Sequence, residues 1–177
     1  VAATTFDRAS GRVRTKLRFG ETVPARLASI SPKLDMLDAL RLPVSGNVEF
    51  TLTRQGKLVD RVKFDLTGGR GLLDLPEVFP APPNIASLRL RGDADAELKS
   101  IYLEELTVDT GGPVISFQGQ INGMPDRTGI HGDFEFREMP FAELKNYWPE
   151  ILLANARPWI LANVLDGVIS RFSVALN

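Results

Sequence analysis

The sequence contains no cysteine, and His131 is its only histidine among 177 residues. The lack of cysteine excludes a disulfide framework, thiolate metal sites, iron–sulfur clusters and a cysteine nucleophile. With a single histidine, a histidine-based metal cage would need several carboxylates in support. Because 21 Lys and Arg are balanced by 22 Asp and Glu, the formal net charge is -1. This balance gives no electrostatic argument for nucleic acid as the main partner.

Long apolar runs and catalytic motifs are missing as well. No stretch approaches the roughly 20 consecutive apolar residues that a membrane-spanning helix needs. A nucleophile elbow, a phosphate-binding loop and a dinucleotide fingerprint do not occur, and the glycines of residues 68–71 are interpreted as a turn. We therefore expect no enzymatic activity, no cofactor and no bound metal. The chain starts at Val1 without an initiator methionine and stops at Asn177 within an alternating run, so we expect a piece of a longer or processed protein.

What the sequence does contain is a repeated alternation of apolar and polar residues. In residues 12–19, apolar side chains alternate with basic ones, as in a half-buried strand. Alternation also occurs in residues 48–52 and 62–66, and Gln55-Gly56 between them predicts a hairpin. Further alternating segments, separated by turn residues, are 85–90, 94–98, 101–108, 115–121, 130–136 and 168–176.

Two segments have helical features instead. Ser31-Pro32 can cap and start a short helix near residues 32–40, before Pro43. The second helical segment lies near residues 140–166 and ends at Asp166-Gly167. The expected fold class is mainly β with minor α, a curled antiparallel sheet with these two helical parts. Groove-forming strands and one short helix would occupy residues 1–138, an amphipathic helical segment 139–167, and a returning strand 168–177.

Such a sheet is wider than its own helices can cover. About nine strands at a spacing of ~4.8 Å make a sheet ~40 Å wide, whereas one helix covers ~10 Å. The predicted helices would therefore cover about half of the apolar face. The rest either closes on itself as a β-sandwich, which periodicity alone favours, or stays open as a groove that holds an apolar guest.

Polar candidates for a site are few. Asp93, Asp95 and Glu97 would place three carboxylates on one strand face, where a hard cation could bind, although a solvated outer face is the simpler interpretation. His131 alternates outward beside Ile130 and is interpreted as a solvated side chain.

Basic and aromatic side chains provide two further candidates. Trp148 and Trp159 suit either a lipid boundary or packing of the terminal helices against the sheet. A basic row could contact anionic lipid headgroups, although flanking acidic residues favour a wet strand face. This row consists of Arg8, Arg12, Arg14, Lys16 and Arg18.

Several short segments together resemble one protein family. The most specific part is the tail, where Tyr147-Trp148-Pro149-Glu150 is followed by the sequence Asn-Ala-Arg-Pro-Trp-Ile of residues 155–160 and by Asp166-Gly167. Residues 43–52 and 88–92 are weaker matches. Over most of residues 12–177 the chain resembles one internal segment of the AsmA-like proteins, in the YhdP-type branch of bacterial envelope proteins, which are bridge-like lipid transfer proteins.

The resemblance implies a long antiparallel sheet curled into a taco-shaped groove with an apolar interior and no catalytic motif. Family members are anchored in the inner membrane, cross the periplasm and are implicated in passing phospholipids towards the outer membrane. It therefore implies a periplasmic location, an anchor in parts of the parent protein outside this chain, and contacts with phospholipid acyl chains and adjacent segments of the parent chain. The residues that would line the groove are Val13, Leu17, Phe19, Val48, Phe50, Leu52, Val62, Phe64, Leu66, Phe134 and Phe136.

Three functional hypotheses follow. The first is a lipid conduit segment that shields acyl chains for passive transport between the inner and outer membrane. The alternative is a structural or assembly module of the cell envelope with a closed β-sandwich core, which binds a protein partner. An enzyme comes third, because a glycosidase-type carboxylate pair would need a cleft that the sequence does not define.

Overall fold

The computed structural model describes residues 1–7, 9–29, 37–74, 82–123, 129–147, 155, 157–163 and 166–176. The strands of its large sheet are β1 (Ala2–Asp7), β2 (Arg12–Thr22), β4 (Val44–Thr53), β5 (Leu58–Gly68), β8 (Ser87–Ala94), β9 (Ser100–Asp109), β10 (Val114–Asn122), β11 (Gly129–Pro140) and β12 (Val168–Leu176). A small sheet consists of β3 (Leu40–Arg41), β6 (Gly71–Leu73) and β7 (Asn84–Ile85), and the helices are α1 (Ala25–Ala28), α2 (Phe141–Tyr147) and α3 (Arg157–Asn163).

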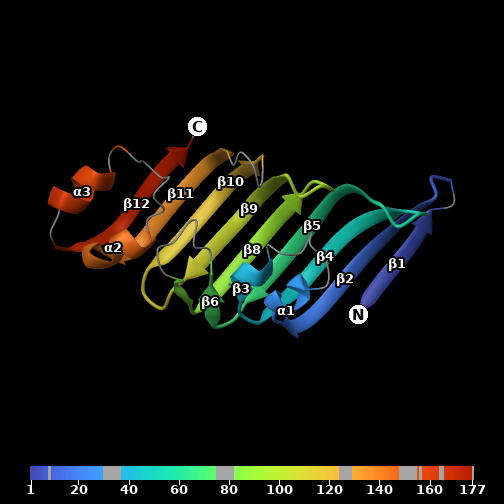
Figure 1. Cartoon of the computed structure of the whole chain (residues 1–177), viewed down its shortest axis with the longest axis horizontal. Coiled ribbons are helices and arrows are strands. Elements are labelled where there is room, and N and C mark those ends of the chain that lie inside the picture. Colours follow the sequence, from blue (N-terminus) through green and yellow to red (C-terminus); the bar gives the residue numbers. More distant parts are fainter. Residues whose placement is uncertain are drawn as a thin grey trace.

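The large sheet is antiparallel throughout and is not closed into a barrel. Its nine strands follow the order β1-β2-β4-β5-β8-β9-β10-β11-β12, so β1 and β12 are its two edges (Figure 1). Strands that neighbour each other in the sheet are neighbours in the sequence, apart from the insertions that carry α1 and the small sheet. This meander is expected when successive alternating segments are joined by short turns.

Cross-strand register sorts the side chains of the large sheet into an apolar face and a polar face. Leu17 lies opposite Val48, and Val48 lies opposite Phe64. The pairing of apolar with apolar positions continues across β8, β9, β10, β11 and β12. Because successive side chains of a strand point to opposite faces, the alternation in each segment becomes one apolar surface across the whole sheet.

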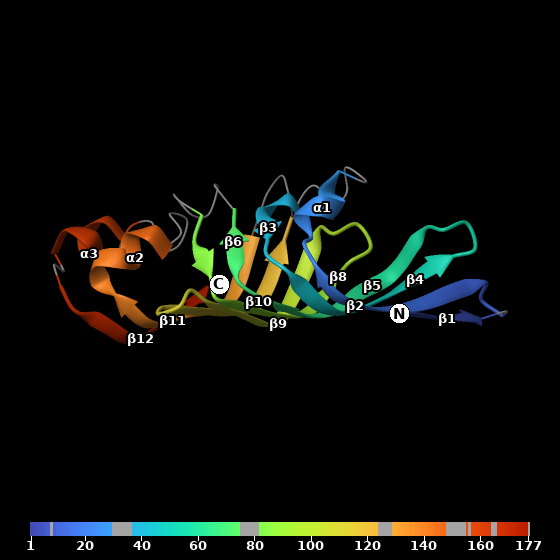
Figure 2. The same cartoon turned by 90° about the horizontal axis from the view of Figure 1, so that it is seen from below.

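The apolar face is covered at one end of the strands. Figure 2 shows α1, the small sheet, α2 and α3 on the same side of the large sheet. The buried cluster beneath them draws on the first residues of β4, β8 and β10 and the last residues of β9 and β11, which lie at the same end of the antiparallel sheet. It consists of Leu42, Val44, Ile85, Leu88, Val108, Ile115, Phe136, Met139, Phe141 and Leu144.

Two glycines on the apolar face bring the backbones of β10 and β11 close together. Gly119 and Gly132 are directly paired, with φ angles of 156° and 151° that favour glycine. A Cβ atom on Gly132 would lie 2.2 Å from the carbonyl oxygen of Gln118, too close for any side chain. The β9–β10 register also shifts between Phe117 and Gly119, as at a β-bulge.

The mainly β fold and the unclosed antiparallel sheet are confirmed, and so is the hairpin predicted around Gln55-Gly56. In the part of the chain that the structure describes, the large sheet is not closed and the second sheet has three short strands, so these residues do not form the closed sandwich that periodicity favours. Of the helix predicted near residues 32–40, residues 32–36 lie outside the described part, 37–39 form one 3₁₀ turn, and Leu40 begins β3. The helical segment near 140–166 contains α2 and α3, and residues 148–154 between them lie outside the described ranges.

The strand predicted over residues 94–98 is wrong. β8 ends at Ala94, and the chain then turns, with Leu98 at a φ of 59°. The Asp95 carboxylate accepts hydrogen bonds from the backbone N–H groups of Glu97 and Lys99, both at 3.0 Å. This local side-chain capping competes with strand pairing and prevails over the alternating pattern.

Candidate functional site

The predicted lining residues lie on one face of the large sheet. Register pairs Val13 with Leu52, and it pairs Val48 with both Leu17 and Phe64. The other predicted residues belong to the same face. Each of them either lies an even number of residues along its strand from a residue of this face or is paired with such a residue on the neighbouring strand. The face was predictable because alternation alone decides which side chains share it.

The lining residues differ in how far they are covered. Phe136 is 1% exposed and lies inside the buried cluster, so it belongs to the core and not to an open lining. Phe19, Leu66 and Phe134 are partly buried and pack against that cluster. Leu17, in contrast, is 38% exposed. The others, Val13, Val48, Phe50, Leu52, Val62 and Phe64, are partly exposed and lie outside the cluster.

Aromatic rings mark the transition from the covered to the open part of the face. The ring centroids of Phe134 and Phe136 are 4.9 Å apart, and those of Phe117 and Phe134 are 6.1 Å apart. Phe172 of the edge strand β12 lies 6.4 Å from Phe136. The tilted rings form a continuous apolar contact across β10, β11 and β12.

The lining prediction missed several apolar positions of the same face. Ile101 lies opposite Ile121, and Ile121 lies opposite Ile130, at the uncovered ends of β9, β10 and β11. Leu176 extends the face to the edge strand β12, where it is paired with Gly132. The same period-two pattern indicates these residues, but only the register shows that they form one row.

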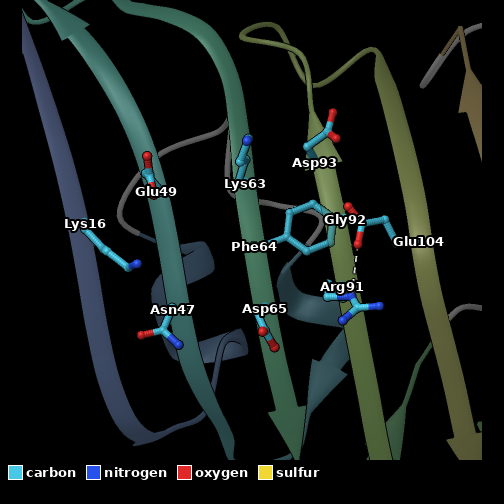
Figure 3. A pocket seen from close by; sticks show the side chains of 10 residues that line it. All are labelled: Lys16, Asn47, Glu49, Lys63, Phe64, Asp65, Arg91, Gly92, Asp93 and Glu104. Carbon is cyan, nitrogen blue, oxygen red and sulfur yellow. Dashed lines mark ion pairs between the residues drawn. The ribbon is translucent and has the colours of Figure 1, made fainter.

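The opposite, polar face carries rows of charges of alternating sign. Lys16 lies opposite Glu49, Glu49 opposite Lys63, and Lys63 opposite Asp93 across β2, β4, β5 and β8. These four side chains line a hollow of about 280 Å³ (Figure 3). Because each charge has an opposite charge beside it, the hollow has no strong field of one sign.

Ion pairs neutralise much of this face. Arg91 and Glu104 are 3.0 Å apart, drawn as the dashed line in Figure 3. Arg89 pairs with the Asp65 carboxylate, which raises the pKa of the Arg89 guanidinium above its usual value. These pairs are largely exposed, so each contributes less than about 1 kcal/mol. They keep the charged side chains of the polar face in contact with water and with one another.

The structure does not gather the three carboxylates proposed as a cation site. Asp93 lies in β8 and pairs with Arg61, Asp95 caps the following turn, and Glu97 pairs with Lys99 at 2.7 Å. The lysine beside Glu97 lowers the pKa of that carboxyl. Across the described ranges, no group of three or more acidic or histidine side chains is placed to hold a metal ion.

The basic row and the aromatic candidates are only partly described. Arg12 pairs with Asp60 at 3.3 Å and Arg14 lies 3.7 Å from Glu49, whereas Arg8 is outside the described residues. Trp159 is 65% exposed on α3, and Trp148 is also outside them. His131 is exposed on the polar face, opposite Gln120. None of the helices in the described ranges is long and apolar enough to cross a membrane.

Comparisons with protein-family models, with curated proteins and with solved structures found no match for this chain. Its function therefore has to be inferred from the surfaces described above.

Proposed function

We propose that this chain is a segment of an AsmA-like, envelope-spanning protein, and that its apolar sheet face shields phospholipid acyl chains during passive transport between the inner and outer membrane. The observation that carries the proposal is the apolar face itself. It runs across all nine strands, and within the described ranges the small sheet and helices cover it at one end of the strands.

The open part of the face is suited to hydrocarbon rather than to a polar ligand. Phe50, Leu52, Val62 and Phe64 project from it and are only partly buried. A contiguous exposed apolar surface is rare on a protein that has no partner for it. A guest that removes this surface from water would stabilise both itself and the protein.

The mechanism is passive. Each methylene group that leaves water for an apolar surface gains ~0.8 kcal/mol, so an acyl chain lying on this face avoids the cost of crossing water. The phospholipid headgroup stays in water at the margin. Binding is unspecific for chain length, because an apolar wall distinguishes one methylene group more or less only weakly. Direction has to come from other parts of the envelope.

Photo-crosslinking on the two faces of the sheet tests the proposal. A photoreactive amino acid is placed at Phe50 or Phe64 on the apolar face, and at Glu49 or Lys63, the preceding residues on the polar face, as matched controls. Each variant is incubated with vesicles of phosphatidylethanolamine and phosphatidylglycerol and irradiated. We expect lipid adducts at the apolar positions and not at the control positions, with lipid-bound protein in native mass spectra.

The other outcomes separate the hypotheses. Equal lipid labelling on both faces, or none on the apolar face, would refute the conduit. In cell extracts, protein adducts at Phe50 or Phe64 without lipid adducts would favour the structural or assembly module and its protein partner. The proposal also places the chain in the periplasm, anchored to the inner membrane through the parent protein. Fractionation of cells that carry the parent protein tests this location.

A further inference from the structure

The helix α3 is held less firmly on the large sheet than its neighbour α2. None of the seven residues of α3 is buried, whereas Phe141 and Leu144 of α2 are 8% and 1% exposed. Ile160 and Leu161 are the residues of α3 that pack against the buried cluster, and both are partly buried. A helix of this length is not stable by itself in water, so α3 depends on this contact to remain helical.

Hydrogen bonds add little to the docking of α3. In the described ranges, the bond that joins α3 to another element runs from the guanidinium Nη2 of Arg157 to the backbone oxygen of Lys145 in α2, and its length is 3.4 Å. This distance is longer than is usual for an N–H···O bond. The side-chain amide of Asn163 donates to the Trp159 carbonyl oxygen, within the helix itself. Two partly buried side chains therefore supply most of the contact.

The docked position also leaves a buried donor unsatisfied. Arg157 Nε is buried, and among the described residues it is the buried side-chain polar atom that has no hydrogen-bond partner. Such a group costs free energy in the docked state and regains water when the helix moves away. The few contacts and the unsatisfied donor together place α3 among the segments that open locally at low cost.

Trp159 gives a lipid surface the means to shift the balance between docked and released α3. A ligand displaces a conformational equilibrium only if it interacts more favourably with one of the two states. Trp159 is 65% exposed in the docked state, so its ring contributes little to docking. At the headgroup level of a membrane an indole is favoured, because its ring is apolar and its N–H group is polar. Trp159 therefore favours release when a membrane is present.

The charge and the position of α3 also suit a lipid surface. Its sequence is Arg-Pro-Trp-Ile-Leu-Ala-Asn, with one basic and no acidic residue. After release, Trp159, Ile160 and Leu161 are three consecutive apolar side chains that can enter the interface, while the guanidinium group of Arg157 can contact anionic headgroups. Figure 1 shows α3 at the outer end of the molecule, beside the edge strand β12, where a membrane can reach it.

We propose that α3 is a lid on the β12 end of the apolar face, and that contact with an anionic phospholipid bilayer releases it. Release frees the apolar surface on which Ile160 and Leu161 rest, so that acyl chains can contact it. The lid ends at Gly167, whose φ of 126° suits glycine and whose carbonyl oxygen accepts a hydrogen bond from the Phe141 N–H at 2.9 Å. The inference rests on the proposed function, since a lid matters only if acyl chains bind this face.

Distances between spin labels in the whole chain test the lid. The protein has no native cysteine, so two introduced cysteines can be labelled without further changes. The test pair, Ala162→Cys with Gln118→Cys, joins an exposed position of α3 to the polar face of β10. The matched pair, Ala142→Cys with Gln118→Cys, joins an exposed position of α2 to the same reference. With vesicles of phosphatidylethanolamine and phosphatidylglycerol, we expect longer distances in the α3 pair and unchanged distances in the α2 pair.

Substitutions separate docking from release. Trp159→Ala should leave the distances without vesicles unchanged and remove the response to vesicles. Tyr102→Ala, which removes an exposed aromatic ring from the polar face of β9, should keep that response. Leu161→Ala should increase the population at long distance even without vesicles, because it removes a docking contact. Leu27→Ala removes the same atoms from an exposed position of α1 and should have no such effect.

The remaining outcomes decide which proposal fails. Distances in the α3 pair that vesicles leave unchanged, or a response that survives Trp159→Ala, would overturn the lid. Equal changes in both pairs would overturn it too, because the whole end of the sheet would then be loosened. Release of α3 without lipid labelling at Phe50 and Phe64 would support release by the bilayer and refute the acyl-chain surface. Labelling at those two positions while α3 stays in place would refute the lid alone.

Discussion

The uneven covering of the apolar face predicts a large difference between two leucine-to-alanine substitutions. Leu144 lies on α2, in the buried cluster at the covered end of the apolar face, and is 1% exposed. Leu17 lies on β2, on the apolar face of the sheet, and is 38% exposed. Both substitutions remove the same atoms. Only the first removes them from a position that is filled on every side.

The expected magnitudes follow from burial. Removing three carbon atoms at ~0.8 kcal/mol each gives about 2.4 kcal/mol for a fully buried leucine. At Leu144 a cavity adds to this, so Leu144→Ala should lower the free energy of unfolding by about 3–4 kcal/mol. At Leu17 about three-fifths of the transfer term applies and solvent fills the space, so Leu17→Ala should cost roughly 1.5 kcal/mol or less. The difference of about 2 kcal/mol is well above the error of such measurements.

Urea unfolding followed by circular dichroism measures both values, with the slope of the transition compared between variants. If Leu17→Ala is as destabilising as Leu144→Ala, the face around β2 is covered in solution and the open-face reasoning is refuted. If instead Leu144→Ala costs less than about 1 kcal/mol, α2 is not docked on the sheet as described.

Three further outcomes are expected. Gly132→Ala should cost about 1–3 kcal/mol in thermal unfolding, because φ is +151° and the new Cβ would lie 2.2 Å from a backbone carbonyl oxygen of β10; an unchanged midpoint would show that the strands are not so close. Asp95→Ala should speed hydrogen exchange at the backbone amides of Glu97 and Lys99 in the turn after β8, because these two N–H groups donate hydrogen bonds to the Asp95 carboxylate. Unchanged exchange rates at these amides would contradict this cap. The hydrogen bond from the Ser10 hydroxyl lowers the pKa of the Asp7 carboxyl in the folded protein. The stabilisation from this ionised carboxylate is therefore complete above the pKa of about 4 that Asp7 has in the unfolded chain, and it is lost as the pH falls through the lower pKa of the folded state. Ser10→Ala should raise the pKa of Asp7 in an NMR titration.

Alternation predicted strands correctly where the residues between two alternating segments also favoured a turn. The hairpin of β4 and β5 was predictable from two alternating segments around Gln55-Gly56. At Asp95 the same alternation failed, because a short carboxylate side chain offers the backbone a turn in place of a strand partner. The strand at Leu40–Arg41 could not be found locally, since its partner Leu72–Leu73 lies more than thirty residues further along the chain.

The alternating pattern predicted which of the candidate lining residues share one face of the sheet, but not which of them are exposed on it. Phe64 and Phe136 have the same alternating context in the sequence, yet Phe136 is buried beneath the covering elements and Phe64 is partly exposed. The row of Ile101, Ile121 and Ile130 was missed for a related reason. Its members come from three strands, and only the pairing registers of these strands bring the three side chains into one row.

Alternation of apolar and polar residues is enough to specify the mainly β fold and the division of each strand into an apolar and a polar side, because the pleat of a strand has a period of two that any alternating segment must follow. Which end of the apolar face is covered, and which polar side chains meet across neighbouring strands, follow from the three-dimensional arrangement of the elements. These depend on bulges, register and the docking of distant segments, which are contacts between parts of the chain that no local pattern encodes.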